Sequence, residues 1–274
     1  MVPAIEPNSC DPLSVRSPCV AVGTLTTVFV VGFPAGSFAA NCYLVAAAPG
    51  EECVIIDPGE NAQRGVDELA RQHRLKPVAV LLTHGHLDHV WSVVPVCGAR
   101  NVPAYIHPGD RELLSDPARG LPLGPAQQLF GGLKLAEPDD VRELTDAATL
   151  RLAGLEIRVD HAPGHTRGSV TFGLPAEPAG DDTMPQEPGA GAGRLFSGDL
   201  LFAGSIGRTD LPGGDYQTIM RSLARVCLPL PAQTVVLPGH GPQTTIGAER
   251  ESNPFLASLV GDSGVAPRTR ATGL

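Results

Sequence analysis

The sequence lacks the features that would place the chain in a membrane or on a nucleic acid. It contains no apolar run approaching the ~20 residues that a membrane-spanning helix needs. Its start, Met1 to Glu6, lacks the basic and then apolar profile of a secretory signal. Its net charge is −9 and its basic residues form no cluster, which argues against a nucleic-acid surface. We therefore expect a cytoplasmic protein that acts on neither a membrane nor a nucleic acid.

Lysine is scarce, and cysteines occur without a pairing motif. Two lysines stand beside eighteen arginines, and alanine, glycine and proline are abundant, a composition that we associate with a GC-rich bacterial genome. The six cysteines form no C-x-x-C pair and fall partly in apolar runs. This pattern predicts buried free thiols in a reducing compartment rather than a disulfide framework.

The densest group of metal-binding side chains follows an apolar, leucine-rich run. His84, His86, Asp88 and His89 lie within six residues. The run before them predicts a buried strand, and the active sites of layered α/β proteins gather at strand ends. Gly85 permits a tight bend that would turn His84 and His86 toward one ion, while Asp88 and His89 open the next helix and face a second. Such density favours a catalytic metal site over ordinary loop histidines.

Three further residues recur in a similar local context. His165, Asp199 and His240 each follow a short apolar stretch and a glycine or proline. Taken singly, each is explained as well by an exposed turn residue. Their joint recurrence favours three more ligands at strand ends.

These motifs, in this order, resemble those of the metallo-β-lactamase-fold hydrolases. Residues 204–210 (GSIGRTD) and 249–256 (ERESNPFL) add a likeness to the glyoxalase II group, which hydrolyses hydroxyacyl thioesters. The resemblance covers about residues 25–258. It implies one metal ion on His84, His86 and His165, a second on Asp88, His89 and His240, and Asp199 as the bridge, with Asp88 and Asp199 also counted as catalytic.

The implied donors are imidazoles and carboxylates without a thiolate. They suit two divalent ions, zinc first, with iron or manganese as alternatives. Two ions ~3.5 to 4 Å apart can share a water whose pKa falls from near 16 toward ~7. The bridging hydroxide would attack a 2-hydroxyacyl thioester, such as an S-lactoylglutathione-like conjugate, whose thiolate leaves readily. The expected partner is this small molecule, and the oligomeric state stays open.

Two charged residues outside the ligand set each have two interpretations. Asp57 closes an apolar run just before Pro58; it either accepts the free N–H of a ligand histidine or caps a strand. Arg208 lies in a glycine-rich segment that should border the metal cleft; it either contacts an anionic substrate or forms a salt bridge with Asp210. Tyr216 begins a helical pattern and is expected to pack rather than to catalyse.

Strand-like runs fall into an early and a late group, each followed by helical patterns, which fits two packed mixed sheets with outer helices. The resemblance names this α/β fold class a four-layer αβ/βα sandwich. We expect strands at 28–33, 41–46, 53–56, 78–82, 104–106, 150–159, 169–174, 194–196 and 234–237, and helices at 62–74, 87–96, 109–115 and 215–226. We assign 1–22 to an N-terminal tail or edge segment, 23–260 to the catalytic domain with a flexible insertion at 177–193, and 261–274 to a C-terminal tail.

The chain departs from the glyoxalase II group at its C-terminal end. Full-length members carry a helical C-terminal domain that contacts glutathione, whereas 34 residues follow His240 here. The thiol carrier therefore stays open. An iron-dependent persulfide dioxygenase stays the alternative function, because that related branch keeps similar ligand positions and a Gly-Arg-Thr-Asp segment. A metal-binding protein without catalysis is disfavoured, because all seven expected ligands are present.

Overall fold

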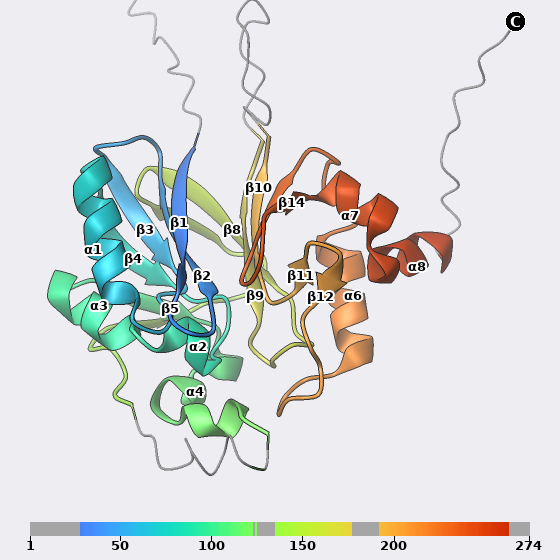
Figure 1. Cartoon of the computed structure of the whole chain (residues 1–274), viewed down its shortest axis with the longest axis horizontal. Helices are drawn as coiled ribbons and strands as arrows, with labels where there is room; N and C mark the ends of the chain where they lie inside the picture. Colours follow the sequence, from blue (N-terminus) through green and yellow to red (C-terminus); the bar gives the residue numbers. More distant parts are fainter. Residues whose placement is uncertain (1–27, 123, 125–134, 177–191, 263–274) are drawn as a thin grey trace, which may run out of the picture.

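Two six-stranded sheets pack face to face, and helices cover both outer faces (Figure 1). The computed structural model describes residues 28–122, 124, 135–176 and 192–262. Both sheets are mixed, because each combines parallel and antiparallel neighbours. The predicted four-layer αβ/βα sandwich is therefore confirmed.

The first sheet begins as an antiparallel meander and continues as parallel strands joined by helical connections, in the order β1-β2-β3-β4-β5-β6. Parallel neighbours bring their carboxyl ends to one edge, so the loops that follow them meet there. The strands are β1 (Phe29–Ala35), β2 (Ala40–Ala46), β3 (Glu52–Ile56), β4 (Lys76–Leu81), β5 (Ala104–Ile106) and β6 (Val141–Glu143). The helical connections are α1 (Ala62–His73), α2 (Leu87–Val90), α3 (Val93–Arg100), η1 (Pro108–Asp110), α4 (Glu112–Ser115) and η2 (Pro117–Gly120).

The second sheet has the order β14-β13-β10-β9-β8-β7, and only β10 and β13 pair in parallel. Its strands are β7 (Thr149–Leu152), β8 (Leu155–His161), β9 (Val170–Leu174), β10 (Arg194–Gly198), β13 (Val235–Pro238) and β14 (Thr244–Thr245). A small hairpin, β11 (Leu201–Phe202) and β12 (Ser205–Ile206), follows β10. The helices on this side are α6 (Tyr216–Val226), α7 (Ile246–Ser252) and α8 (Pro254–Asp262).

Side chains alternate between the two faces of each sheet and build three apolar layers. In β3, Ile55 packs with residues of α1 and α3, whereas Val54 packs between the sheets. In β13, Val236 packs with residues of α6, α7 and α8, whereas Leu237 packs between the sheets. This period of two, apolar on both sides, is what strands buried on both faces require.

The run 150–159, expected as one strand, forms a hairpin of two. Leu152 of β7 pairs with Leu155 of β8, and the connecting residues Ala153 and Gly154 have φ values of 52° and 71°. Two consecutive positive φ angles give the type I′ turn that matches the twist of a two-residue hairpin. The continuous apolar pattern concealed this turn, since a single glycine marks it.

Two expected helices are interrupted. The helix expected over 87–96 divides into α2 and α3 at Ser92. The N–H of Ser92 donates to the Pro58 carbonyl (3.0 Å), and its hydroxyl accepts from the N–H of Ala62 (3.1 Å). These bonds to the start of α1 replace continuation of the helix. The pattern over 109–115 forms η1 followed by the short α4.

Three further expectations differ from the structure. Tyr216 is 51% exposed rather than packed, because the apolar face of α6 begins only at Ile219. Ala192 and Gly193, expected in the flexible insertion, are buried, and the Gly193 carbonyl accepts from Val235 (2.9 Å) beside β10. Helix α8 extends two residues into the expected C-terminal tail. Residues 1–22, 177–191 and 263–274 lie outside the described residues.

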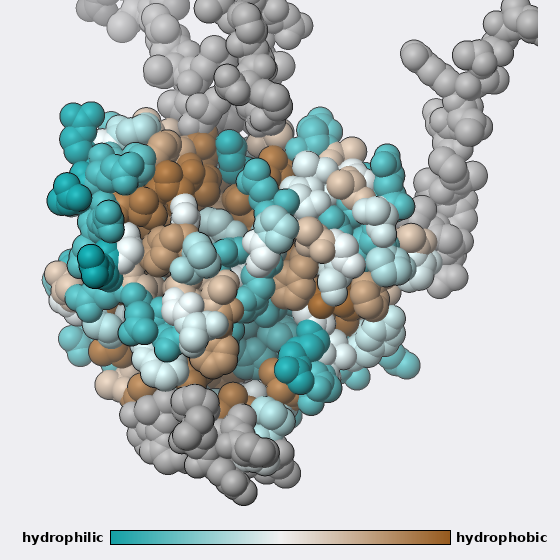
Figure 2. Space-filling model, viewed as in Figure 1, coloured by the Kyte–Doolittle hydropathy of each residue, from teal (hydrophilic) through white to brown (hydrophobic). Residues whose placement is uncertain are grey.

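Four of the six cysteines are described, and all four are buried free thiols, as predicted: Cys42, Cys53, Cys97 and Cys227. Cys10 and Cys19 lie outside the described residues. Figure 2 shows apolar residues gathered over β1, the edge strand of the first sheet, where Phe29, Val30 and Val31 are partly exposed. Across the described ranges, every helix is too short or too polar to span a bilayer.

Candidate metal centre

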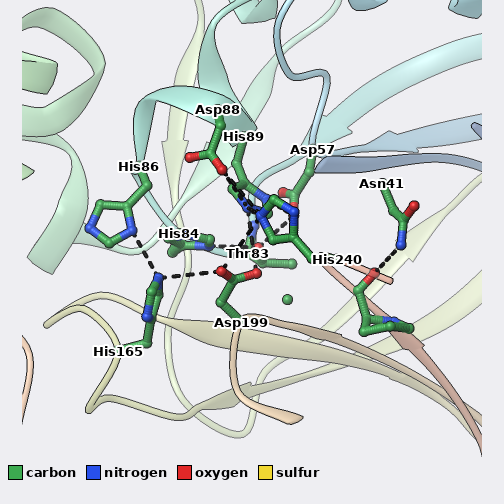
Figure 3. A network of polar contacts seen from close by, with 12 residues as sticks. Asn41, Asp57, Thr83, His84, His86, Asp88, His89, His165, Asp199 and His240 are labelled. Carbon is green, nitrogen blue, oxygen red and sulfur yellow. Dashed lines mark hydrogen bonds and ion pairs between the residues drawn. The ribbon is translucent and has the colours of Figure 1, made fainter. Parts of the chain in front are cut away.

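The seven expected ligands meet at the edge of the sandwich where strands of both sheets end. Figure 3 shows His86 and His165 on one side, Asp88, His89 and His240 on the other, and Asp199 between them. The side chains come from four segments: the turn after β4 together with α2 (His84, His86, Asp88, His89), the β8–β9 loop (His165), the β10–β11 connection (Asp199) and the end of β13 (His240).

The first group consists of His84, His86 and His165, whose ring nitrogens lie within 4.8 Å of one another. The Nδ1–H of His165 donates to the Arg208 carbonyl (2.8 Å), so its Nε2 keeps a lone pair. The hydroxyl of Thr83 donates to a carboxylate (2.6 Å) and therefore accepts from His84 Nδ1 (3.1 Å), which leaves a lone pair on Nε2 of His84. Lone pairs of two imidazoles thus point inward.

The second group consists of Asp88, His89 and His240, again with ligand atoms within 4.8 Å. The Nδ1–H of His89 donates to Asp57 (3.0 Å), so the lone pair lies on Nε2. That Nε2 is 3.2 Å from Nε2 of His240, which is itself 3.1 Å from an oxygen of Asp88. Two imidazole nitrogens and one carboxylate oxygen therefore converge on one point.

Asp199 contacts both groups. Its Oδ2 lies 3.6 Å from Nε2 of His165 and 3.8 Å from Nε2 of His240, while its Oδ1 lies 3.5 Å from Nε2 of His89. A carboxylate in this position could serve both ligand groups.

Histidine pKa values shift in opposite directions in the two ligand groups. Burial, followed by the neighbouring imidazoles, holds the pKa of His84 well below its ordinary value. Burial and His165 likewise lower the pKa of His86 to about 3. Burial also disfavours charge on His89, but Asp88, Asp199 and Asp57 outweigh it and raise its pKa to about 10. Neutral imidazoles on one side and a carboxylate-rich environment on the other both suit a bound cation.

Asp57 supports the second group from behind. Its Oδ1 accepts from the Thr83 N–H (2.8 Å), and its Oδ2 accepts from the Thr83 hydroxyl (2.6 Å) and from His89 Nδ1 (3.0 Å). Asp57, His84 and His89 also form a third group of closely spaced ligand atoms. Because both Asp57 oxygens already accept hydrogen bonds, its geometry suits orienting His89 better than reaching an ion.

Asp110 of η1, which lies outside the expected motifs, joins two loops that carry expected ligands. It is 1% exposed and accepts from Gly85 N–H (2.9 Å), Thr166 hydroxyl (2.6 Å) and Gly168 N–H (2.7 Å). Gly85 separates His84 from His86, and Thr166 directly follows His165. The only sequence signal was an aspartate after Pro-Gly at the end of an expected strand.

Gly85 itself needs room rather than an unusual backbone angle. A Cβ there would approach the Leu113 Cβ to 2.8 Å and the Asp110 carbonyl oxygen to 2.9 Å, and its φ is not positive. Close packing of η1 and α4 against the turn is thus a reason for this glycine in addition to the expected bend.

The second sheet's ligand loop is fastened to the first sheet by β2. The N–H of Asn41 donates to the Gly239 carbonyl (2.7 Å), and its side chain donates to the carbonyls of Pro238 (3.0 Å) and Gly241 (2.9 Å). A Cβ on Gly239 would collide with Asp199 Oδ1 and lie 2.8 Å from His89 Cε1. Only a glycine at this position, next to His240, leaves room for the Asp199 carboxylate and the His89 imidazole to approach the loop.

Arg208 borders the site but is already paired. Its guanidinium forms two 2.7 Å bonds to Asp210, and both side chains are exposed. The salt bridge considered from the sequence is therefore present, and the Arg208 main chain additionally orients His165. Arg208 lines a cavity of about 480 Å³ together with Asp88, Asp199 and the ligand histidines His86, His165 and His240.

The cluster fits divalent metal ions. The buried Nε2 atoms of His84 and His86 and the buried Oδ1 of Asp199 have no hydrogen-bond partner within the described ranges. Buried polar atoms are ordinarily paired, and the orphaned Nε2 of His84 and Oδ1 of Asp199 belong to the cluster itself, which favours a bound cation there. The histidine nitrogens and carboxylate oxygens are borderline-to-hard donors, which suit zinc, iron or manganese.

Known proteins resemble this chain along most of its length. Residues 35–178 and 189–240 match the family described as "Metallo-beta-lactamase superfamily". An uncharacterised protein of Mycobacterium tuberculosis is 46% identical over 85% of this chain and 99% of its own length. The protein named hydroxyacylglutathione hydrolase GloC of Haemophilus influenzae is 34% identical over 82% of this chain and 96% of its own length.

Two solved structures are similar along most of the chain. The B3 metallo-β-lactamase BLEG-1 covers 83% of this chain with 99% of its own, at 38% identity and a TM-score of 0.69. TTHA1623 in a di-iron-bound form covers 83% of this chain with 100% of its own, at 39% identity and a TM-score of 0.64. By its family match, its fold and its near full-length relatives, the chain belongs to the metallo-β-lactamase superfamily.

Proposed function

We propose that this chain is a metal-dependent hydrolase that cleaves the thioester of a 2-hydroxyacyl thiol conjugate in the cytoplasm. The observation that carries the proposal is the pair of ligand groups joined by Asp199, beside a cavity large enough for a small molecule. The relative named as a hydroxyacylglutathione hydrolase, similar along nearly its whole length, supports the thioester as substrate.

In this proposal His84, His86 and His165 hold one ion, Asp88, His89 and His240 hold the other, and Asp199 bridges them. Such ions supply Lewis acidity and lower the pKa of water from near 16 toward ~7. The iron-containing relative supports iron beside zinc and manganese as candidate metals.

The residues of the chain supply orientation. Asp57 and the Arg208 carbonyl each hold one N–H of a ligand histidine, which fixes the direction of the opposite nitrogen. The cavity would place the acyl carbonyl against the cluster. A thiol with a pKa of ~8.5 leaves as a thiolate, so the reaction needs no strong proton donor from the chain.

The test also distinguishes two other reactions. The similarity to BLEG-1 supports hydrolysis of a β-lactam amide as a second candidate. A persulfide dioxygenase would require redox-active iron with open positions, whereas hydrolysis requires only a Lewis acid. The iron of TTHA1623 keeps this alternative in the experiment.

The test measures thiol release from S-D-lactoylglutathione by protein of known metal content. Parallel samples receive glutathione persulfide in an oxygen electrode or a chromogenic cephalosporin. Thiol release without oxygen uptake supports the proposal; oxygen uptake with bound iron, or cephalosporin cleavage alone, assigns the alternatives. Asp199→Ala should lower metal content and turnover together, while Asp140→Ala, which breaks an exposed pair with Arg142, should change neither.

A further inference from the structure

Beyond the expected metal ligands, most of the residues that line the cavity are apolar, and Ser205 and Arg208 are the polar ones among its described lining. Phe38, Leu121, Phe202, Ile206 and Leu211 line it. They come from the β1–β2 loop, the segment after η2, the β11–β12 hairpin and the loop before α6. A substrate in this cavity would therefore contact mainly apolar side chains next to the cluster.

Phe38 is held at this mouth although it is 48% exposed. The carboxylate of Glu60 accepts from the N–H (2.6 Å) and the hydroxyl (2.5 Å) of the adjacent Ser37. These two bonds fasten the loop without burying the phenyl ring. An exposed aromatic ring fixed beside a cavity is a surface prepared for contact with a ligand.

The cavity offers no unpaired cationic side chain among its described lining residues. Arg208 is the cation of that lining, and it forms two bonds of 2.7 Å to Asp210. The hydrogen bonds from Arg208 lower the pKa of Asp210 to about 2, so the pair is ionised and internally neutral at physiological pH. A substrate carboxylate at Arg208 would have to displace Asp210 from the guanidinium.

We propose that the thiol carrier of the substrate is uncharged where it contacts this cavity. The proposal rests on the thioester function above and narrows its substrate class. A carrier with carboxylates would lose hydration against apolar walls without gaining an unpaired cationic side chain from the described lining in return. An uncharged carrier would bury its carbon atoms against Phe38, Phe202 and Leu211. Each square ångström of apolar surface removed from water then strengthens binding.

The test compares two thioesters that differ only in charge: S-lactoyl-N-acetylcysteine, with a free carboxylate, and its amide. We expect kcat/KM to be ~10-fold higher for the amide. Asp210→Asn frees the Arg208 guanidinium and should raise kcat/KM for the carboxylate ~5-fold, with the amide unchanged. Asp140→Asn, which breaks an exposed pair with Arg142 away from the cavity, is the matched control and should change neither substrate.

A binding measurement separates this inference from the function on which it rests. Thioether analogues of the two compounds, which cannot be hydrolysed, are titrated calorimetrically into the metal-loaded protein. Tighter binding of the amide analogue, weakened ~5-fold by Phe38→Ala, supports an uncharged carrier. Equal or tighter binding of the carboxylate analogue overturns it. If neither thioester is cleaved, the proposed function fails, and the two analogues still decide the preference of the cavity.

Discussion

Replacing Asp110 by asparagine tests whether the first ligand group depends on a residue that touches none of its imidazoles. The carboxylate accepts three hydrogen bonds of 2.6 to 2.9 Å, two of them from main-chain N–H groups of Gly85 and Gly168. An asparagine amide has one oxygen and one NH₂ group. Whichever way it turns, one of these N–H donors faces another donor.

The expected loss of folding stability follows from the energies of these hydrogen bonds. A hydrogen bond to a charged group contributes ~1.5 to 3 kcal/mol, and an unsatisfied buried donor costs a further ~1 to 3 kcal/mol. We expect Asp110→Asn to lower the free energy of unfolding by about 2 to 4 kcal/mol and to loosen the turn between His84 and His86. In the proposed two-ion site, bound metal should fall from ~2 ions to ~1 per chain, because Asp110 bonds to Gly85 and Thr166, which adjoin the three histidines of the first group.

The assays are urea unfolding of the metal-free protein and metal analysis after dialysis against a fixed free-metal concentration. Asp160→Asn is the matched control, because Asp160 is also buried but pairs with Arg158 away from the cluster. It should reduce stability and leave the metal content unchanged. Full metal content in Asp110→Asn at a similar loss of stability would refute the link between Asp110 and the first group.

Three further predictions concern the cluster directly. Asp57→Asn should weaken metal binding ~10- to 100-fold by removing the anionic acceptor of His89, and competition with a chromophoric chelator measures this; unchanged affinity contradicts the supporting role. Gly239→Ala should abolish tight metal binding, because the added Cβ would collide with Asp199 and His89. The same chelator assay checks this on a variant whose circular dichroism shows that it is folded. Normal metal binding would show that the loop moves to accept the Cβ. Removing metal with a chelator should lower Tm, and returning the ion should restore it. A metal at 100 times its Kd stabilises the folded protein by ~2.7 kcal/mol. An unchanged Tm would show that the folded protein does not bind the ion more tightly than the unfolded chain does.

The elements that were predictable share a strong local pattern. The apolar runs that became β2, β3, β4 and β9 are buried on both faces, and such runs are continuous in the sequence. The expected helices over 62–74 and 215–226 matched α1 and α6, because both carry a buried apolar stripe. By contrast, β6, β11, β12 and β14 have two or three residues each, and so short a segment shows no period.

The helices after His240 were missed for a different reason. Helix α7 begins at a Thr245 cap whose side chain accepts from Ala248, and its buried Glu249 accepts from Gly204 (2.8 Å), Thr244 (2.6 Å) and Asn253 (2.8 Å). A buried glutamate weakens the apolar pattern on which a helix prediction rests. Its partners come from the β11–β12 hairpin and from both ends of α7, so only the folded chain explains it.

The sequence by itself determined which side chains can bind metal and that they follow strands, because ligand chemistry and strand periodicity are local properties of the chain. The tertiary structure decided which nitrogen of each imidazole faces inward, because that choice depends on partners distant in sequence, such as Asp57 for His89 and the Arg208 carbonyl for His165. It also decided the role of Asp110, whose three donors lie in two loops that meet only when the two sheets pack. The neutral pairing of Arg208 was one of two interpretations open in the sequence, and the fold of its loop chose between them.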